Sequence, residues 1–149
     1  MKIQEYHQPE ISEDRIDFYY RRKNKDVQEL LAVLRKHSSR LSGKSEDRDV
    51  VFSLKDVYYF ESVDKRTFAY LDHEVLRIEF RLQDIEEAYG STGFVRVNKS
   101  TIVNIYKIES LKSEINMRII AILENGEKIQ INRSYKANFN KMLNSLRER

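Results

Sequence analysis

Short apolar runs alternate with polar turns over most of the chain. The runs at residues 50–52 and 57–60 are rich in β-branched and aromatic side chains, which favour strands. Lys55 and Asp56 lie between these runs and suit a bend. We therefore predict two successive strands here, and the same pattern predicts several more. The later strands are expected at residues 67–71, 75–80, 94–97, 102–103, 117–123 and 128–131.

Two of the connections between these runs predict hairpins. Residues 72–74 separate the run at 67–71 from the run at 75–80. The second signal is stronger, because Asn125 and Gly126 tolerate the positive φ that a type I′ turn needs at both central residues. Antiparallel pairing of neighbouring strands is therefore expected.

An amphipathic helix is predicted near the N-terminus. Asn24 is a suitable N-cap, and the apolar residues after it recur at helical spacing. Such a stripe most often packs on its own domain, and a homodimer seam is the alternative. The stripe consists of Val27, Leu30, Leu31 and Leu34.

Two shorter helices are expected later in the chain. The first spans residues 82–89, with Leu82, Ile85 and Tyr89 on one face and Gly90 after it. The second closes the chain and has one apolar face. That face contains Tyr135, Phe139, Met142, Leu143 and Leu146.

These elements divide the chain into two parts. Residues 1–48 are expected to form a small N-terminal α/β appendage, with a strand at residues 16–20, the amphipathic helix, and a polar loop or linker at residues 38–49. Residues 49–149 are expected to form a β-rich domain. The predicted fold class is mainly β with short helices, an α+β arrangement.

The composition fits one domain of ordinary size. The 149 residues are 40% hydrophobic and 34% charged, so a core can form beneath a strongly charged surface. Cysteine is absent, which excludes disulfides and thiolate metal or redox sites. The sequence lacks an apolar run long enough for a membrane span, and its N-terminus lacks the apolar stretch of a signal peptide. We expect a soluble protein of the cytoplasm.

The net charge of +3 is unevenly distributed along the chain. Residues 1–48 carry +2, residues 49–90 carry −5 and residues 91–149 carry +6. A basic part joined to an acidic part indicates polyanion binding, and a mixed, solvated surface is the alternative.

The residues that could carry catalysis form no recognisable site in the sequence. The three histidines lie in different predicted elements without ligand spacing, and the four glycines form neither a phosphate-binding loop nor a dinucleotide fingerprint. Asp84, Glu86 and Glu87 near the start of a short helix are typical of a solvated face. A hydrolase or transferase would need these acids and His73 to converge in one pocket. We expect no enzyme activity, no cofactor and no metal site.

Three polar, basic segments lie between the predicted strands or after the last of them. They are residues 64–67, 96–101 and 132–136. Each combines cations, which neutralise phosphates, with hydroxyl or amide groups that bind base edges or phosphate oxygens. Together the segments predict nucleic-acid binding.

The same segments carry a family signature. The chain resembles LytTR domains, the DNA-binding output modules of many bacterial regulators, over residues 50–147. The matching stretches are residues 54–62 (LKDVYYFES), 94–104 (FVRVNKSTIVN), 108–111 (IESL) and 123–135 (LENGEKIQINRSY). The resemblance implies an elongated set of small antiparallel β-sheets with short helices. It also implies that promoter direct repeats are read through loops in the major groove.

The resemblance further implies which residues contact double-stranded DNA. The loop after residue 62 and the Arg-x-x-Lys-Ser segment are expected near a major groove, and the turn into the last helix at a second contact. Arg96 and Asn104 are either DNA contacts or structural residues. The expected contact residues are Lys65, Arg66, Thr67, Asn98, Lys99, Ser100, Asn132, Arg133, Ser134 and Lys136.

The chain departs from the family pattern in two of these segments. Asn98 stands where the family often has histidine. Asn132 and Ser134 replace the more usual Ser and Arg of the family's Ser-Arg-Arg-Tyr pattern. These changes bear on the strength of the second contact and on base preference.

The N-terminal part sets the expected kind of regulator. Many relatives carry a phospho-acceptor receiver domain ahead of this module, and 48 residues are too few to hold one. The sequence resembles stand-alone LytTR regulators, so we expect a sequence-specific transcriptional regulator controlled from outside the chain, often by a co-encoded membrane inhibitor protein. The alternative is a protein-interaction module controlled by a membrane or cytoplasmic partner, with DNA binding weak or secondary.

Overall fold

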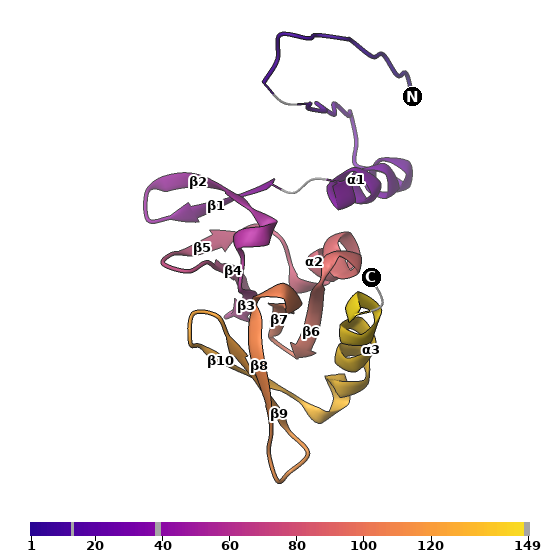
Figure 1. Ribbon diagram of the computed structural model, residues 1–149. Coiled ribbons are helices and arrows are strands. Elements are labelled where there is room, and N and C mark those ends of the chain that lie inside the picture. Colours follow the sequence, from indigo (N-terminus) through magenta and orange to yellow (C-terminus); the bar gives the residue numbers. More distant parts are fainter. Residues whose placement is uncertain (13, 38–39, 148–149) are drawn as a thin grey trace.

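Antiparallel strands make up most of the protein. The computed structural model describes residues 1–12, 14–37 and 40–147. Its strands are β1 (Arg40–Ser45), β2 (Arg48–Ser53), β3 (Tyr59–Val63), β4 (Arg66–Tyr70), β5 (Val75–Ile78), β6 (Phe94–Asn98), β7 (Thr101–Asn104), β8 (Ile108–Ser113), β9 (Ile119–Leu123) and β10 (Lys128–Ile131). Its helices are α1 (Lys25–His37), α2 (Leu82–Tyr89) and α3 (Lys136–Arg147), with single 3₁₀ turns between elements (Figure 1).

The strands form two sheets. One has seven strands in the order β2-β1-β5-β4-β3-β7-β6, and the other has three in the order β10-β9-β8. The two sheets follow one another along the long axis of the molecule (Figure 1). The expected fold class, mainly β with short helices in small antiparallel sheets, is therefore confirmed.

Two apolar cores hold these sheets. The first lies where α2 covers one face of the seven-stranded sheet, and it contains the fully buried Phe60, Leu76 and Ile85. The second lies between the two sheets and α3, and it contains the fully buried Leu123 and Phe139. Alternation along the strands sends neighbouring residues to opposite faces, so Tyr59 joins the second core while Phe60 joins the first.

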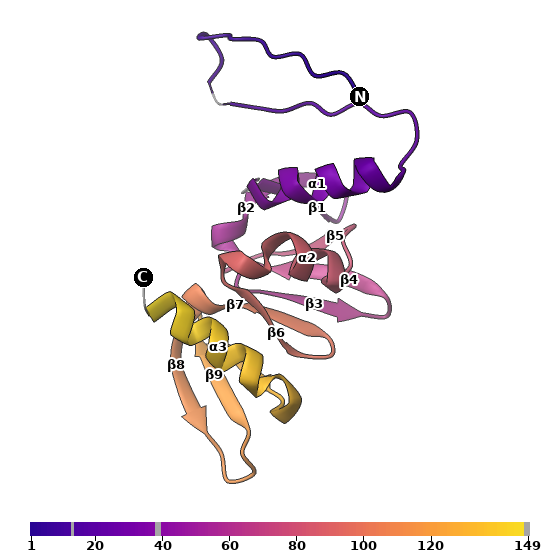
Figure 2. The same ribbon diagram turned by 90° about the vertical axis from the view of Figure 1, so that its right-hand side faces the viewer.

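Helix α1 packs on its own chain. Asn24 caps it as expected, because the Asn24 side-chain oxygen accepts a hydrogen bond from the Val27 backbone N–H at 2.9 Å. Val27 is buried, and α1 lies alongside α2 (Figure 2). The apolar stripe of α1 thus contributes to the intramolecular core, as in the first of the two interpretations. Dimerisation through Val27, Leu30, Leu31 and Leu34 stays a prediction.

The two later helices confirm their sequence predictions. Helix α2 has the predicted bounds, and its predicted apolar residues Leu82, Ile85 and Tyr89 are buried. In α3, Phe139 is buried, and Met142 and Leu143 pack partly against the same core. The side chain of Leu146 lies outside the described residues.

The prediction for the N-terminal part was wrong in two places. Residues 16–20 form no strand in the structure. Residues 40–49 of the predicted polar loop instead form β1, the turn after it and the start of β2, while residues 38 and 39 lie outside the described part. Strand β1 carries Leu41 as its one large apolar residue, so its sequence lacks the alternation that identifies a half-buried strand. Whether residues 1–48 and 49–149 fold independently stays a prediction.

The pair of positive φ values predicted for the turn at Asn125 and Gly126 occurs in a different turn. The hairpin at Asn125 and Gly126 forms between β9 and β10, but only Gly126 has positive φ, at 88°. The Asn125 side-chain oxygen accepts from the Glu127 backbone N–H at 3.1 Å and closes this longer loop. The pair of positive φ values belongs to Asp64 (50°) and Lys65 (64°), which join β3 to β4. A tight two-residue turn therefore presents Lys65.

Candidate nucleic-acid interface

Two of the three polar, basic segments lie at the same edge of the seven-stranded sheet. Strands β3 and β7 pair antiparallel, with Glu61 opposite Thr101. The end of β3 and the start of β7 therefore coincide, and the Ser62 backbone N–H donates to the Ser100 carbonyl at 2.8 Å. The β3–β4 turn and the β6–β7 turn are thus neighbours.

The third segment is joined to the second by hydrogen bonds between the two sheets. The Asn132 backbone N–H donates to the Val97 carbonyl at 2.8 Å. The Asn98 side-chain amide donates to the Gln130 carbonyl at 3.2 Å. Figure 2 shows the β3–β4 turn, the β6–β7 turn and the start of α3 on one side of the molecule. We call this side the contact edge, made up of residues 64–67, 96–101 and 132–136.

Asn98 holds the β6–β7 turn in place. Its side-chain oxygen accepts from the Ser100 backbone N–H at 3.0 Å and from the Ser100 hydroxyl at 3.1 Å. Its amide nitrogen is the donor to Gln130 already described. Asn98 and Ser100 are half-buried, and their polar groups form hydrogen bonds within the turn. They therefore support the exposed Lys99 between them.

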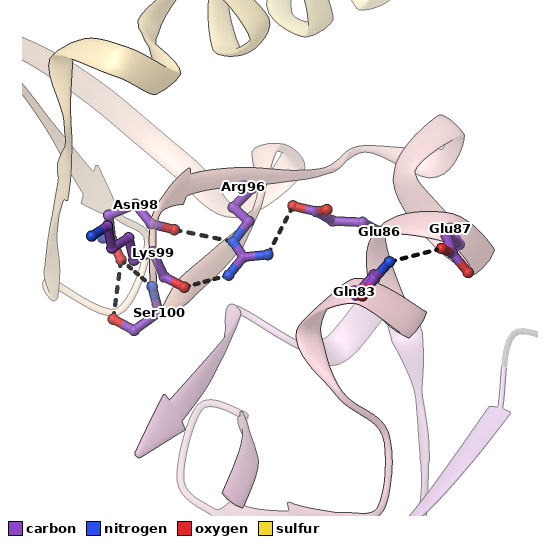
Figure 3. A network of polar contacts seen from close by, with 7 residues as sticks. All are labelled: Gln83, Glu86, Glu87, Arg96, Asn98, Lys99 and Ser100. Atoms are coloured by element: carbon purple, nitrogen blue, oxygen red, sulfur yellow. Dashed lines mark hydrogen bonds and ion pairs between the residues drawn. The ribbon is translucent and has the colours of Figure 1, made fainter. Parts of the chain in front are cut away.

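Arg96 fastens the same turn to helix α2 (Figure 3). Its guanidinium donates to the Asn98 carbonyl at 3.3 Å and to the Lys99 carbonyl. On its other side it forms an ion pair with Glu86 at 3.5 Å. These contacts support the structural role for Arg96 over the direct DNA contact that the sequence left open. The role of Glu86 carried no local sequence signal, because it depends on how α2 packs beside β6.

Asn104 is likewise a structural residue. It is 2% exposed, and its side-chain amide donates to the Val57 carbonyl at 2.8 Å. Its side-chain oxygen accepts from the Tyr106 backbone N–H at 3.1 Å and caps a 3₁₀ turn. All of this lies inside the fold, away from any surface that DNA could reach.

The predicted contact residues differ in their accessibility. Lys65, Arg66, Lys99, Arg133 and Ser134 are exposed, and none of these four cations forms an ion pair with any described residue. Unpaired cations on one surface attract polyanions.

The remaining predicted contact residues are less available to a ligand. Thr67 is only 5% exposed, so a ligand cannot reach its hydroxyl in this conformation. Asn132 and Lys136 are half-buried, and the Asn132 side chain accepts from Gln130 at 3.4 Å. The exposed part of the third segment is therefore Arg133 and Ser134.

A tyrosine pair lies at the end of the β3–β4 hairpin that is far from its turn. The rings of Tyr59 and Tyr70 stack with centroids 4.2 Å apart, and the Tyr70 hydroxyl donates to Glu61 at 3.2 Å. Burial raises the pKa of both phenols, and the carboxylates of Glu61 and Glu127 raise it further. Both tyrosines therefore stay neutral at physiological pH, and Tyr70 holds Glu61 against the sheet.

The acids considered for catalysis do not converge with His73. Asp84 accepts from the Arg81 backbone N–H at 3.0 Å, Glu86 pairs with Arg96, and Glu87 accepts from a neighbouring glutamine. His73 lies in the β4–β5 turn, which is at the opposite end of the sheet from α2's first turn. Among the described residues there is also no cluster of three or more metal-ligating side chains. The geometry required by the hydrolase hypothesis is absent from the described part of the chain.

The described helices have neither the length of a membrane span nor the arrangement of a helix-turn-helix. None of those in the described ranges is long and apolar enough to cross a membrane. Strands also separate each described helix from the next along the chain, so the described helices form no helix-turn-helix.

Comparisons with known proteins agree with this geometry. Sensory transduction protein LytT of Enterococcus faecalis is 28% identical over 100 residues, which cover 67% of this chain and 41% of LytT. The chain thus spans less than half the length of that relative. An uncharacterised HTH-type transcriptional regulator of Staphylococcus aureus is 26% identical over 151 aligned positions, covering 100% of this chain and 97% of the relative.

A solved structure and a family match complete the comparison. The structure of a LytTr DNA-binding domain from Bacillus cereus superposes with a TM-score of 0.68 at 25% identity, covering 71% of this chain and 97% of that one. The LytTr DNA-binding domain family itself matches residues 47–144, which include the whole contact edge. The chain therefore belongs to the LytTr family of DNA-binding domains, and its module is one of DNA-binding transcriptional regulators.

Proposed function

We propose that this protein is a sequence-specific transcriptional regulator that reads promoter DNA in the major groove through its contact edge. The observation that carries the proposal is the convergence of three polar, basic segments on one edge, joined by the hydrogen bonds of Asn98, Ser100 and Asn132. Three segments far apart in sequence form one surface whose exposed cations have no ion-pair partner among the described residues, and family membership supplies the ligand class.

The three turns have different roles in the proposed complex. Lys65, Lys99 and Arg133 are exposed, so they are positioned to contact phosphates and base edges. Asn98 and Ser100 set the shape of the middle turn, and Arg96 fixes it to α2. Paired direct repeats in the promoter would engage two copies of the contact edge, one on each repeat.

Footprinting on the DNA upstream of the protein's own gene is the first test. The protected sequence then serves for fluorescence anisotropy with the wild type and with Lys99→Ala and Arg133→Ala. Each neutralised phosphate contributes about −0.9 to the slope of log affinity against log salt, so a variant that loses one phosphate contact should show a slope shallower by about that amount.

Lys112→Ala is the matched control. Lys112 is exposed on β8, in the other sheet and away from the contact edge, and the substitution removes the same charge as Lys99→Ala. We expect the control to bind like the wild type. If Lys99→Ala and Arg133→Ala bind the footprinted DNA as tightly as Lys112→Ala at matched salt, the contact edge is not the DNA-binding surface.

A further inference from the structure

A cationic hollow lies next to the β3–β4 turn. It has a volume of about 830 Å³ and is enclosed by β1, β5, the start of β4, the first turn of α2 and the segment before α1. Its lining includes six basic residues, Lys23, Lys44, Lys65, Arg66, Arg77 and Arg81. The family-like segments account for Lys65 and Arg66, and the other four belong to none of them.

The charge of the hollow is not neutralised within the protein. Three acids share the lining, Asp49, Glu79 and Asp84, and Asp84 is engaged in capping α2. None of the six basic side chains forms an ion pair with another residue of the described ranges. Six cations against three acids leave an excess of positive charge inside a concave surface, where the low dielectric of the walls strengthens its pull on an anion.

The backbone forces two of these cations together. Lys44 on β1 and Arg77 on β5 are the register partners at which the two strands pair. On its other side Lys44 lies opposite Asp49 of β2, so the acid next to Lys44 balances one of the two charges and leaves the other in excess. Like charges directly opposite each other on neighbouring strands are destabilising. Gly43 permits the close approach, because a Cβ there would lie 2.9 Å from the Leu76 Cβ and 3.1 Å from the Arg77 carbonyl. A bound anion between Lys44 and Arg77 would relieve their repulsion.

The position of the hollow indicates which anion it binds. Lys65 and Arg66 belong both to its lining and to the contact edge, so a ligand held at the edge continues into the hollow. We propose that the hollow binds backbone phosphates of the DNA that flank the groove read by the contact edge. Lys44 and Arg77 are the main partners of these phosphates, with Lys23 and Arg81 beside them. This inference rests on the proposed function and extends its footprint toward β1.

The test compares the double variant Lys44→Gln/Arg77→Gln with the wild type by fluorescence anisotropy across a salt series. Glutamine keeps much of each stem and removes the charge. We expect affinity to fall on the order of tenfold on specific and unrelated DNA alike, because phosphates carry no sequence information, and the salt slope to become shallower by about 1.8. Trimming the flanking base pairs from the footprinted DNA should weaken the wild type more than the variant, which keeps only Lys23 and Arg81 as flanking contacts.

Lys112→Gln/Arg118→Gln is the matched control, since it removes one lysine and one arginine from exposed positions around β8 and β9. We expect it to keep the wild-type slope. Urea unfolding establishes that both double variants are folded. Lys23→Gln, in the exposed segment before α1, provides a second variant that leaves the sheet intact and should reduce the slope by about half as much as the double variant.

The other possible results distinguish a failure of the hollow from a failure of the contact edge. If Lys99→Ala loses affinity while Lys44→Gln/Arg77→Gln and Lys23→Gln keep the wild-type affinity and slope, the hollow takes no part in DNA binding and the contact edge stands. If Lys99→Ala and Arg133→Ala also bind normally, the contact edge is not the DNA-binding surface and the proposed function itself fails. Titration calorimetry with inorganic phosphate, without DNA, covers the remaining case. Phosphate binding that the double variant abolishes, together with an unchanged DNA slope, would assign the hollow to a free anion and overturn the DNA assignment.

Discussion

Asn98 influences the proposed DNA interface through the shape of the β6–β7 turn. One side chain donates to Gln130 in the other sheet and accepts twice from Ser100. It therefore links the two sheets at the point where Lys99 is presented. A polar residue in a DNA-binding segment can thus act on the position of its neighbour, and such a residue affects stability as well as affinity.

Asn98→Ala should lower both the free energy of unfolding and the affinity for DNA. The Gln130 carbonyl and the Ser100 groups lose their partners, which costs about 1–3 kcal/mol where the groups stay shielded from water. Urea unfolding and anisotropy on the footprinted DNA measure the two effects. Asn116→Ala, at an exposed position between β8 and β9, is the control and should change neither. An Asn98→Ala variant as stable as the control would show that the turn does not depend on this side chain.

Tyr59 makes the free energy of unfolding depend on pH in the alkaline range. Its folded-state pKa lies above the unfolded value of 10.0, first because of burial and then because of the nearby Glu127 carboxylate. The folded protein therefore retains this proton more strongly than the unfolded chain. The stabilising contribution is complete below pH 10 and is lost as the pH rises above it.

Tyr59→Phe should reduce this alkaline loss of stability. Phenylalanine keeps the stacking on Tyr70 and has no proton to lose. The free energy of unfolding, measured by urea titration at pH 8 and pH 11, should fall less for the variant than for the wild type. Tyr6→Phe is the control, because Tyr6 is 76% exposed. Equal losses in Tyr59→Phe and Tyr6→Phe would exclude Tyr59 as the responsible group.

At the scale of elements, substitutions in the β3–β4 turn can change DNA affinity and folding stability in opposite directions. Lys65 adopts a φ of 64°, which an L-residue other than glycine occupies at a cost of roughly 1 kcal/mol. Lys65→Gly should therefore raise the free energy of unfolding by up to about 1 kcal/mol while weakening DNA binding. Lys65→Ala removes the same charge without relieving the backbone.

Thermal unfolding and anisotropy distinguish these two variants. We expect equal losses of DNA affinity in Lys65→Gly and Lys65→Ala, and a higher melting temperature for the glycine variant alone. A melting temperature of Lys65→Gly below that of Lys65→Ala would contradict the strained turn. Unchanged affinity in both would remove Lys65 from the interface.

The elements that could be predicted from sequence are those whose pattern is local. The runs that became β3 and β9 contain consecutive apolar residues, and Asn24 marks the start of α1 with a cap. Strand β1 has only Leu41 and β8 is exposed along most of its length, so neither shows a buried face in sequence. Their pairing with other strands makes them strands, and pairing is a tertiary property.

The candidate site likewise has features that the local sequence predicts and features that depend on tertiary contacts. The segments containing Lys65, Lys99 and Arg133 were recognisable because three separate segments combine cations with amide or hydroxyl groups, and because they carry the family resemblance. Their convergence depends on sheet order, and the supporting role of Arg96 depends on Glu86 in a separate helix. The hollow needs β1 beside β5, and β1 was not predicted as a strand. Contacts between elements therefore account for most of what sequence reasoning missed.

At the scale of the whole molecule, the first 22 residues contribute little to the fold. Phe18 is half-buried, and the other large apolar side chains described there are exposed, among them Ile3 at 86% and Tyr19 at 89%. Helix α1 differs, because Val27 is 5% exposed. Deleting residues 1–22 should leave the free energy of unfolding unchanged, and deleting residues 1–37 should lower it by about 2 kcal/mol or more through loss of buried apolar surface.

Urea unfolding of the two truncated chains and the full chain checks this expectation. Light scattering at several concentrations on the same samples tests the homodimer prediction. An equal number of subunits in the full chain and in the 1–37 deletion would exclude a dimer that depends on α1. Destabilisation by the shorter deletion would show that the N-terminal segment packs more tightly than its exposure indicates.

The order of strands also fixes a length scale. Between the β3–β4 turn and the β6–β7 turn lie two strand-to-strand steps of about 4.8 Å, so the turns are about 10 Å apart. Along one DNA strand successive phosphates advance by about 3.4 Å, so this separation corresponds to about three base-pair steps. The spacing of the strands therefore holds the two turns at a constant distance from each other. Substitutions in the turns can change which bases are preferred, but the interval between the positions read stays constant, since altering it would require adding or removing a strand.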